Sequence, residues 1–330
     1  MHLSDKIYVA GHQGLMGSAL VRGLMALGHN NLLLRSHDQL DLTDQHAVQD
    51  FFAEERPAYV FLAAAKVGGI LANSKYPADF ISKNLLIQTH VIDTAYLTKV
   101  TRLLFLGSSC IYPKHAPQPL KEEYLLSGPL EPSNRSYAVA KISGIEMCSS
   151  YNKQYATHFL AAMPTNLYGP GDRYDLHDSH VVPALIRKMH EAKISGADQV
   201  VVWGSGKPRR EFLYSDDAAE ACIFLMNLPE SEFGTLVNAS TVFPIINIGC
   251  GEDLAIMEVA RIIAETVGFK GSIRCDRSKP DGTPRKLLDV TRLRRLGWSP
   301  RTPFRDGLVR TYSDFKMQQN RVGESHVVTR

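Results

Sequence analysis

Tyr137 and Lys141, four residues apart, are residue types whose spacing suggests a catalytic role. They lie in RSYAVAKISGIEMCSSYNKQY, which is predicted to be helical from about residue 136. On a helix this spacing puts both side chains on one face. A free tyrosine has a pKa of about 10, and an ammonium group nearby would lower it. Tyr137 is therefore predicted to protonate an alkoxide during ketone reduction, or to accept its proton in reverse.

The stretch GSSCIYPK, residues 107–114, supplies two further candidates. Ser108 is predicted to hydrogen-bond the carbonyl oxygen that Tyr137 protonates. Cys110 follows two residues later, and a thiol acts as an acid or base near neutral pH when its neighbours stabilise the thiolate. A cysteine here is also compatible with a small buried hydrophobic residue. The residues alone leave both interpretations open.

The beginning of the chain has the pattern of a nucleotide-binding unit. A β-prone run at 7–10 is followed by a glycine-rich turn, a helical pattern that ends at Gly28, and an apolar run at 32–34. The turn holds Gly11, Gly14 and Gly17, and such glycines let a pyrophosphate approach the backbone at a helix N-terminus. We therefore predict dinucleotide binding over a purely structural turn.

The residues at the end of the second predicted strand indicate whether the dinucleotide carries a 2′-phosphate. This strand ends in Arg35, with Ser36 and His37 beside it. A guanidinium group can donate two hydrogen bonds to a 2′-phosphate, which favours NADP(H), whereas a solvated arginine is the alternative. Asp41 is predicted to reach the adenine, and Asp44 to be the N-cap of the next helix.

The order of the remaining elements predicts an α/β fold with a doubly wound, Rossmann-type parallel sheet. Apolar runs at 58–65 and 102–110 alternate with helical patterns at 45–55 and 79–97. In the second half, helices near 181–193, 215–228, 255–267 and 304–319 alternate with short strands. Ligands of such sheets lie beyond the carboxyl ends of the strands, which is where GSSC falls.

Composition excludes several classes of protein. The 330 residues include 37 Lys and Arg against 34 Asp and Glu, a formal net charge of +3 that does not suggest nucleic-acid binding. The sequence has no 18-residue apolar stretch and no signal-peptide pattern after its N-terminus, so neither a membrane span nor secretion is expected. Five cysteines without a CxxC pair fit the reducing cytoplasm, with no disulfides and no metal site.

Several longer motifs resemble the GDP-L-fucose synthase family of the extended short-chain dehydrogenase/reductase superfamily. They are LAAAKVGGI (62–70), GSSCIYPK, MPTNLYGP (163–170), SHVVPALIRKMHEA (179–192), VVWGSG (201–206), REFLYSDD (210–217) and SKPDGTPRKLLDVTRLRRLGW (278–298). The resemblance covers roughly residues 5–315. It implies an NADPH-dependent enzyme that converts GDP-4-keto-6-deoxy-D-mannose into GDP-L-fucose by 3,5-epimerisation and 4-keto reduction.

The resemblance also implies roles for individual residues. Cys110 and His180 would be the base and the acid of epimerisation, although the sequence does not fix which is which, and a helix N-terminal histidine is the alternative for His180. Ser108, Tyr137 and Lys141 would carry out the reduction. Related dehydratases have an Asp-Glu pair where this chain has Ser109 and Cys110, which disfavours elimination of water.

The binding residues implied by the resemblance fall into two sets. Cofactor contacts are expected from Gly11, His12, Gln13, Gly14, Leu15, Met16, Gly17, Arg35, Asp41, Leu42, Lys141, Pro164, Thr165, Asn166, Leu167 and His180. Contacts with the GDP-sugar are expected from Lys188, Trp203, Arg210 and Asp281. An exposed helix lysine is the alternative for Lys188, and a core position is the alternative for Trp203.

The resemblance further implies a division of the chain and a homodimer. Residues 1–168 would form the NADP-binding domain, with segments near 211–250 returning to it, and 169–330 would be mainly the smaller substrate-binding α/β domain. The homodimer would form through the helix of Tyr137 and the helix at 79–97.

Other products and functions stay open at this point. Gln13 stands where many bacterial members have arginine, which weakens the preference for NADP. A GDP-L-colitose synthase, which epimerises only carbon 5 of a 3,6-dideoxy ketosugar, is the closest alternative. A non-catalytic NADP-sensing module is a remote one, because both Tyr137 and Lys141 are present.

Overall fold

The central sheet has six parallel strands in the part of the chain that the structure describes, with the order β2-β1-β3-β4-β5-β9. The structure is a computed structural model that describes residues 1–175, 179–238, 243–279 and 281–327. The strands are β1 (Ile7–Ala10), β2 (Leu32–Leu33), β3 (Tyr59–Leu62), β4 (Arg102–Leu106), β5 (Phe159–Pro164) and β9 (Ile245–Ile248). Strand β1 lies between β2 and β3, so the strand order reverses there, and a ligand crevice is expected at such a reversal.

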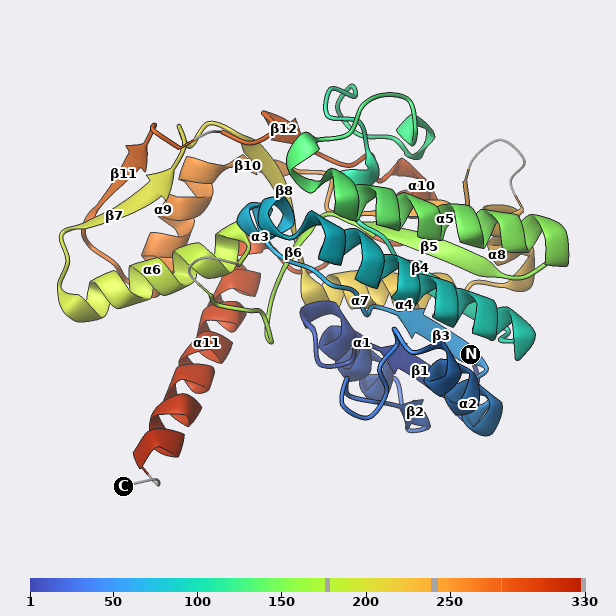
Figure 1. Ribbon diagram of the computed structural model, residues 1–330. Coiled ribbons are helices and arrows are strands. Elements are labelled where there is room, and N and C mark those ends of the chain that lie inside the picture. Colours follow the sequence, from blue (N-terminus) through green and yellow to red (C-terminus); the bar gives the residue numbers. More distant parts are fainter. Residues whose placement is uncertain (176–178, 239–242, 280, 328–330) are drawn as a thin grey trace.

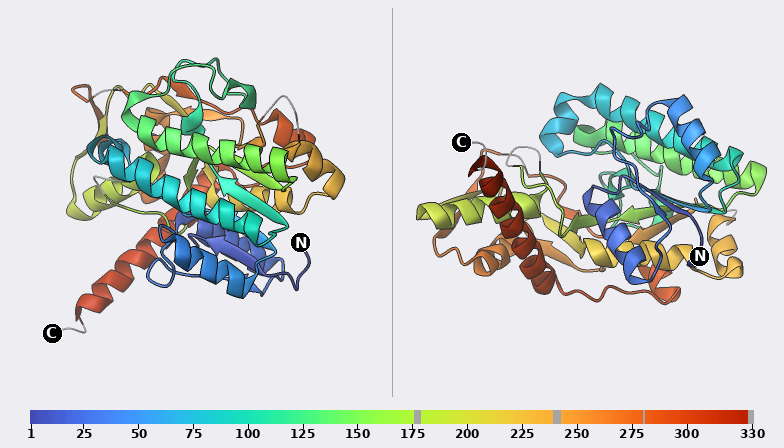
Figure 2. Two further views of the ribbon diagram at one scale, coloured as in Figure 1. Left: turned by 45° about the vertical axis from the view of Figure 1, so that its right-hand side comes forward. Right: turned by 90° about the horizontal axis from the view of Figure 1, so that it is seen from below.

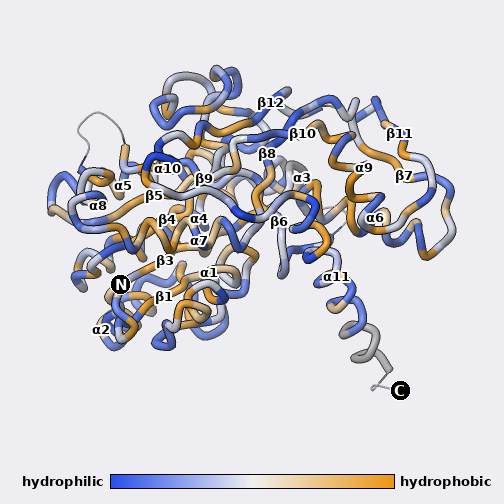
Figure 3. Tube along the Cα trace, turned by 180° about the vertical axis from the view of Figure 1, so that it is seen from behind, coloured by the Kyte–Doolittle hydropathy of each residue, from blue (hydrophilic) through white to orange (hydrophobic). Residues whose placement is uncertain are grey.

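Helices cover both faces of this sheet (Figures 1 and 2). Along β1, Tyr8 packs into a core with α2 (Gln45–Glu55), α4 (Pro77–Leu97) and α5 (Arg135–Tyr155). The next residue, Val9, packs on the other face with α1 (Leu15–Ala26), α7 (Ser215–Met226) and α8 (Glu230–Val237). Strands buried on both faces need apolar residues throughout, and Figure 3 shows this hydrophobic interior. The predicted doubly wound α/β fold is confirmed.

A second, smaller group of elements packs beside the C-terminal ends of the main strands. In it β8 (Arg209–Tyr214) pairs with β6 (Asn166–Tyr168), β10 (Asp253–Ala255) and β12 (Arg285–Lys286). The strands β7 (Gln199–Trp203) and β11 (Ser272–Asp276) form a separate pair. Helices α6 (Val181–Ser195), α9 (Ile256–Val267) and α11 (Phe304–Val327) share an apolar core there, and α11 then projects away from the body of the molecule (Figure 1). The proposed domain division at residue 168, with segments near 211–250 returning to the first domain, stays a prediction. Helix α7 and strand β9 lie within that returning range and pack in the main sheet layer.

Short elements complete the architecture. They are α3 (Ile70–Lys75), α10 (Thr291–Arg295) and three 3₁₀ turns at Ser109–Ile111, Glu122–Tyr124 and Pro132–Asn134. Within the described part of the chain, no helix has the length and apolar character needed to cross a membrane.

The glycine-rich turn between β1 and α1 is closely packed at one glycine and open at another. A Cβ on Gly17 would lie 2.0 Å from the carbonyl oxygen of Gly11, whereas a Cβ on Gly14 would meet that oxygen at 3.5 Å. Gly14 has φ −78°, which any residue adopts, and lines the large cavity described below. Both glycines line the cavity, but only Gly17 is also required for close backbone packing.

Alanine substitutions are expected to separate backbone packing from ligand access. Gly17→Ala should lower the free energy of unfolding by about 2 kcal/mol or more, because backbone atoms must move to relieve the overlap. Gly14→Ala should leave stability near that of the wild type but weaken dinucleotide binding, because its methyl group occupies space beside the helix N-terminus. Thermal unfolding and fluorescence titration with NADPH measure the two effects. Equal loss of stability in both variants would contradict this assignment.

A buried carboxylate, Glu211 on β8, joins segments that form the site. Its two carboxylate oxygens accept hydrogen bonds from the backbone N–H groups of Gly251 (2.7 Å) and Leu288 (2.9 Å). Its carbonyl oxygen accepts one from Asn166 Nδ2 at 2.8 Å. Burial raises the pKa of Glu211, and these backbone donors work against that rise. Glu211 thus fixes the chain that follows β12 relative to the segment that follows β5.

Candidate active site

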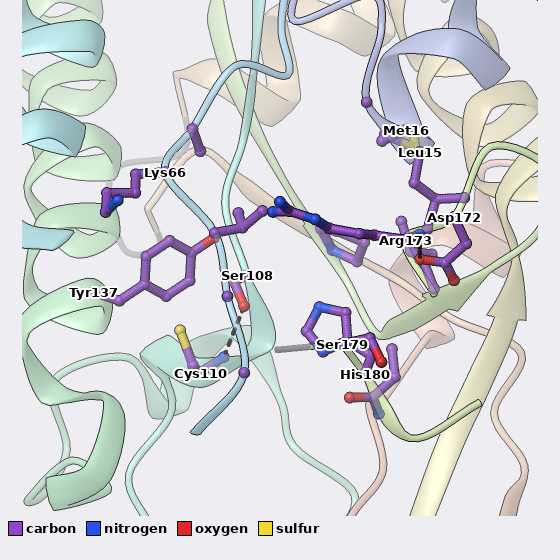
Figure 4. A pocket seen from close by; sticks show the side chains of 18 of the residues that line it. Leu15, Met16, Lys66, Ser108, Cys110, Tyr137, Asp172, Arg173, Ser179 and His180 are labelled. Atoms are coloured by element: carbon purple, nitrogen blue, oxygen red, sulfur yellow. Dashed lines mark hydrogen bonds between the residues drawn. The ribbon is translucent and has the colours of Figure 1, made fainter. Parts of the chain in front are cut away.

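A large cavity of about 1660 Å³ lies beyond the C-terminal ends of the main strands and extends to the second group of elements; we call it the main cavity. Its walls include the glycine turn, the GSSC segment, the start of α5 and the start of α6, part of which Figure 4 shows. All sixteen residues named above as cofactor contacts line this cavity, and so do all five proposed catalytic residues. The structure therefore brings together residues that are far apart in the sequence.

The end of the main cavity beside α1 fits a dinucleotide. Gly14 is the N-cap of α1 and uses no side chain to satisfy the first backbone N–H groups of the helix, which are suited to bind a pyrophosphate. His12 lines the same wall, and its buried Nδ1 has no hydrogen-bond partner among the described residues. Open backbone donors and an unsatisfied buried nitrogen are what a phosphate-rich ligand would complete.

Arg35, the residue predicted to recognise a 2′-phosphate, is held by an acidic neighbour in this structure. Its Nη2 donates to Glu55 Oε1 at 2.7 Å, and its guanidinium lies 5.4 Å from the centre of the Phe51 ring. Nearby, the carboxylate of Asp41 accepts hydrogen bonds from both the backbone N–H and the hydroxyl of Thr43, which lower its pKa. Asp44 caps α2 by accepting from the Ala47 N–H, as expected.

Replacing Arg35 by leucine is expected to weaken NADPH binding by roughly tenfold to a hundredfold, since a hydrogen-bonded ionic contact is worth about 1.5–3 kcal/mol. NADH binding should change little, so the variant should lose preference between the two. Glu55→Gln is the matched control, because it releases the Arg35 guanidinium without removing it, and NADPH affinity should be kept or improved. Isothermal titration with both dinucleotides tests this, and an unchanged NADPH-to-NADH ratio in Arg35→Leu would assign 2′-phosphate recognition elsewhere.

Tyr137, Lys141 and Ser108 meet at the centre of the main cavity. Tyr137 and Lys141 lie one turn apart on α5, and Lys141 Nζ is 5.8 Å from the centre of the Tyr137 ring. Lys141 Nζ donates to the carbonyl oxygen of Leu106 at 2.7 Å, which anchors it at the end of β4. Ser108 follows that strand end and caps the Ser109–Ile111 turn. The hydroxyl groups of Tyr137 and Ser108 thus face one volume (Figure 4).

The electrostatics of this group differ in one respect from the expectation. Burial lowers the pKa of Lys141 to about 8. Burial also raises the pKa of Tyr137, and the Cys110 thiol adds to that rise. The chain by itself therefore does not make Tyr137 more acidic. The positive charge of an oxidised nicotinamide, if bound beside the ring, would favour the phenolate and lower this pKa.

Cys110 and His180 face the main cavity from different sides. Cys110 is buried beneath the cavity at the Ser109–Ile111 turn, with 8% of its surface exposed. His180 is exposed and is the N-cap residue of α6. In the view of Figure 4, Ser108 lies between the two side chains, with Cys110 on the side of Tyr137. The thiol and the imidazole thus lie on different sides of Ser108 in the wall of one cavity.

The surroundings of Cys110 act in opposite directions on the pKa of its thiol, which is raised overall. Burial raises its pKa, and the charge of Lys286 opposes this most strongly, followed by the Ser108 hydroxyl and the charge of Lys141. Lys286 lies on β12, in a segment far from GSSC in the sequence. Burial lowers the pKa of Lys286, the neighbouring thiol raises it, and the charge of Arg210 lowers it further. Thiol and amine thus influence each other's ionisation.

The proposed substrate contacts lie at the far end of the main cavity, and one of the four stands apart. Trp203, Arg210 and Asp281 line the cavity. Lys188 is not among the lining residues; its Nζ lies 5.1 Å from the centre of the Trp203 ring, on which it packs. The Asp281 carboxylate accepts from the backbone N–H (2.8 Å) and hydroxyl (2.6 Å) of Ser205, so it also shapes the turn after β7. Trp203 is 49% exposed and is not a core residue.

Sequence reasoning missed several residues of the site. Lys286 and Asn134 line the main cavity close to Cys110, and neither was singled out although both lie in or beside quoted segments. Lys66 also lines the main cavity. The buried Asn84 side chain of α4 accepts a hydrogen bond from the backbone N–H of Lys66 and donates one to its carbonyl oxygen. A lysine within the LAAAKVGGI motif was the available signal for Lys66. Nothing in the local pattern indicated Lys286, because its approach to Cys110 depends on the packing of β12.

Comparisons with known proteins show the family to which the chain is related. The model of the NAD dependent epimerase/dehydratase family matches residues 7–240. A GDP-L-fucose synthase of Arabidopsis thaliana is 54% identical over 94% of this chain and 92% of its own length. The GDP-L-fucose synthase of Escherichia coli is 52% identical over 96% and 98%. Among solved structures, a GDP-6-OMe-4-keto-L-xylo-heptose reductase from C. jejuni has 40% identity and a TM-score of 0.91, covering 96% of this chain and 99% of its own.

The fold and the site define a Rossmann-type enzyme class in which a bound dinucleotide lies beside a nucleotide-sugar pocket. A second structural neighbour, a GDP-L-fucose synthetase from Naegleria fowleri bound to NADP, has a TM-score of 0.85 at 28% identity, over 97% of this chain and 96% of its own. The chain belongs to the NAD dependent epimerase/dehydratase family and, within it, to the GDP-L-fucose synthases.

Proposed function

We propose that this protein converts GDP-4-keto-6-deoxy-D-mannose into GDP-L-fucose with NADPH. The observation that carries the proposal is that one cavity holds two sets of groups, Ser108 with Tyr137 and Cys110 with His180. The first set suits the reduction of a ketone and the second the epimerisation of the carbons beside it. A simple reductase needs only the first set.

Epimerisation is assigned to Cys110 and His180. The Cys110 thiolate removes a proton from the carbon next to the ketone, and the charge of Lys286 stabilises that thiolate. His180 returns a proton to the opposite face of the same carbon. Two groups are needed because one group cannot easily serve both faces of a ring. We assign Cys110 as the base because it is buried beside a cation, and His180 as the acid because it is exposed and readily reprotonated from solvent.

Reduction is assigned to Tyr137, Ser108 and Lys141. NADPH, when bound, supplies the hydride that adds to carbon 4. Tyr137 gives its proton to the oxygen that becomes a hydroxyl, and Ser108 hydrogen-bonds the same oxygen and fixes its position. Lys141, anchored on the Leu106 carbonyl oxygen, keeps a positive charge beside the Tyr137 ring. This charge stabilises the phenolate left after proton transfer.

Incubation of the purified protein with NADPH and each of two ketosugars tests the proposed function. We expect NADPH oxidation with GDP-4-keto-6-deoxy-D-mannose and a product that NMR identifies as GDP-L-fucose. The 3,6-dideoxy analogue tests GDP-L-colitose synthesis, which we disfavour because the GDP-L-colitose synthase of Yersinia pseudotuberculosis is 33% identical, well below the fucose enzymes. NADPH binding without turnover on either sugar would instead support a non-catalytic sensor.

We also propose that the protein acts as a homodimer through α4 and α5. These two helices pack side by side (Figures 1 and 2), and they expose the apolar side chains of Leu86, Leu97 and Tyr155. Covering these side chains with a second copy removes apolar surface from water. Light scattering should give twice the mass of one chain, and a monomer at micromolar concentration would contradict the proposal.

A cytoplasmic location is proposed from the cysteines. All five lie in the described part of the chain, and each has a free thiol there. Free thiols, including one proposed as a base, are kept in a reducing compartment.

A further inference from the structure

A second, smaller cavity lies next to Cys110 and has a volume of about 60 Å³; we call it the side cavity. Cys110 and Lys286 line both the side cavity and the main cavity. The thiol and the amine therefore stand at the junction of the two. This volume has room for a few water molecules, since one needs roughly 10–15 Å³ on this measure.

The walls of the side cavity carry several polar groups beside apolar ones. Lys114 Nζ and Glu131 Oε2 form an ion pair of 3.0 Å there, and both residues also line the main cavity. Both side chains remain partly exposed, so this pair lies where the side cavity opens toward solvent. The buried Oδ1 of Asn134 has no hydrogen-bond partner among the described residues. A buried amide oxygen of this kind is completed by water. The side cavity thus offers a short polar path from Cys110 to bulk water.

The proposed reaction creates a need for such a path. Epimerising carbons 3 and 5 in turn brings two protons to Cys110 while the same sugar is bound. The thiol must release the first before it can accept the second. His180 is exposed and exchanges directly with solvent, but Cys110 is buried, and a bound sugar covers the face it presents to the main cavity. The proton must leave by another side.

We propose that the side cavity carries the proton of Cys110 to solvent while the sugar is bound, with the Lys286 amine as its first acceptor. This inference rests on the proposed epimerisation. The carbon–hydrogen bond breaks, and its proton converts the Cys110 thiolate into a thiol beside the Lys286 ammonium. The ammonium then releases its own proton to water in the side cavity and becomes a neutral amine. The thiol passes its proton to this amine, which restores the thiolate–ammonium pair for the second carbon. His180 supplies the new proton on carbon and regains one from solvent, so the net change is isomerisation alone.

The electrostatic coupling of the two groups fits this relay. Burial opposes charge on each of them, while each charged form favours the other. The neutral pair and the ion pair are therefore closer in free energy than two separate buried charges would be, and a proton can move between them.

Deuterium exchange into the substrate tests the relay. With NADP⁺ in place of NADPH, reduction cannot occur, so deuterium uptake from D₂O at carbons 3 and 5 reports proton transfer alone. Lys286→Met should slow uptake about tenfold or more, with the second carbon affected most. Lys286→Arg should remain slow, because guanidinium keeps its charge but does not give up its proton. Methylamine added to a Lys286→Ala variant should restore uptake, because this substitution vacates the space of the side chain and methylamine can accept a proton.

The controls separate the relay from a structural role and from the proposed function. Lys121→Met removes a lysine that pairs with Glu123 and lines neither cavity, and this variant should exchange at the wild-type rate. Unchanged NADPH affinity in each variant verifies folding. Wild-type exchange in Lys286→Met, full activity in Lys286→Arg, or no rescue by methylamine would each overturn the relay. Absence of exchange in the wild-type protein would instead remove the proposed epimerisation itself.

Discussion

Replacing Tyr137 by phenylalanine is expected to lower kcat for ketone reduction by roughly 10²–10⁴-fold, the usual contribution of a positioned general acid. The substitution removes only the hydroxyl, so the ring can keep its edge-on contact with Phe80 at 6.2 Å between centroids. Binding of NADPH should change little. Stopped-flow absorbance of NADPH with GDP-4-keto-6-deoxy-D-mannose measures the reduction step directly.

Hydrogen exchange provides the second half of this test. Because Cys110 and His180 are intact in Tyr137→Phe, deuterium uptake at carbons 3 and 5 should continue while reduction stops. Tyr124→Phe is the control, since it removes a tyrosine hydroxyl from the Glu122–Tyr124 turn, which does not line the main cavity. If exchange disappears together with reduction, Tyr137 takes part in both half-reactions and the separation proposed here is wrong.

The parallel sheet was largely predictable from local pattern, because buried parallel strands are uniformly apolar and the helices between them are periodic. Strand β1 has the predicted bounds, and the helices that begin near 45 and 181 were found within two residues. The strands that were not predicted individually are β5, β6, β8, β10, β11 and β12. Short strands such as β12, with the two residues Arg285–Lys286, exist only because β8 offers a paired edge. No local period marks such a strand.

Some residues of the candidate site could likewise be predicted from local sequence patterns, whereas others depend on contacts between distant segments. The glycine turn, Ser108 and the Tyr137–Lys141 pair were found because their spacing is itself the signal. Cys110 and His180 needed the family resemblance, and their placement on one cavity required coordinates. Three features could not be predicted from the sequence: the role of Lys286, the pairing of Arg35 with Glu55, and the side cavity. Each depends on contacts between side chains from distant segments.

Cys110→Ser is expected to reduce deuterium exchange at carbons 3 and 5 by roughly 10²–10⁴-fold while NADPH affinity stays near that of the wild type. A serine hydroxyl fits the same space beneath the cavity, but it is far less acidic than a thiol, so the charge of Lys286 cannot make it a useful base. Mass spectrometry of the substrate after incubation in D₂O with NADP⁺ gives the rate. Cys275→Ser is the matched control, because Cys275 lies on β11 and its sulfur donates to the carbonyl oxygen of Ser205, in the turn after β7, at 3.3 Å.

The same variant also tests whether Cys110 and His180 act as one unit. His180→Asn alone should slow exchange at the step that returns a proton, and the double variant should be little slower than either single one, since a base without its acid partner achieves no inversion. Additive losses would mean that each residue serves a separate carbon. Exchange at the wild-type rate in Cys110→Ser would remove the thiol from the reaction, and with it the reason for a lysine and a polar cavity beside a buried cysteine.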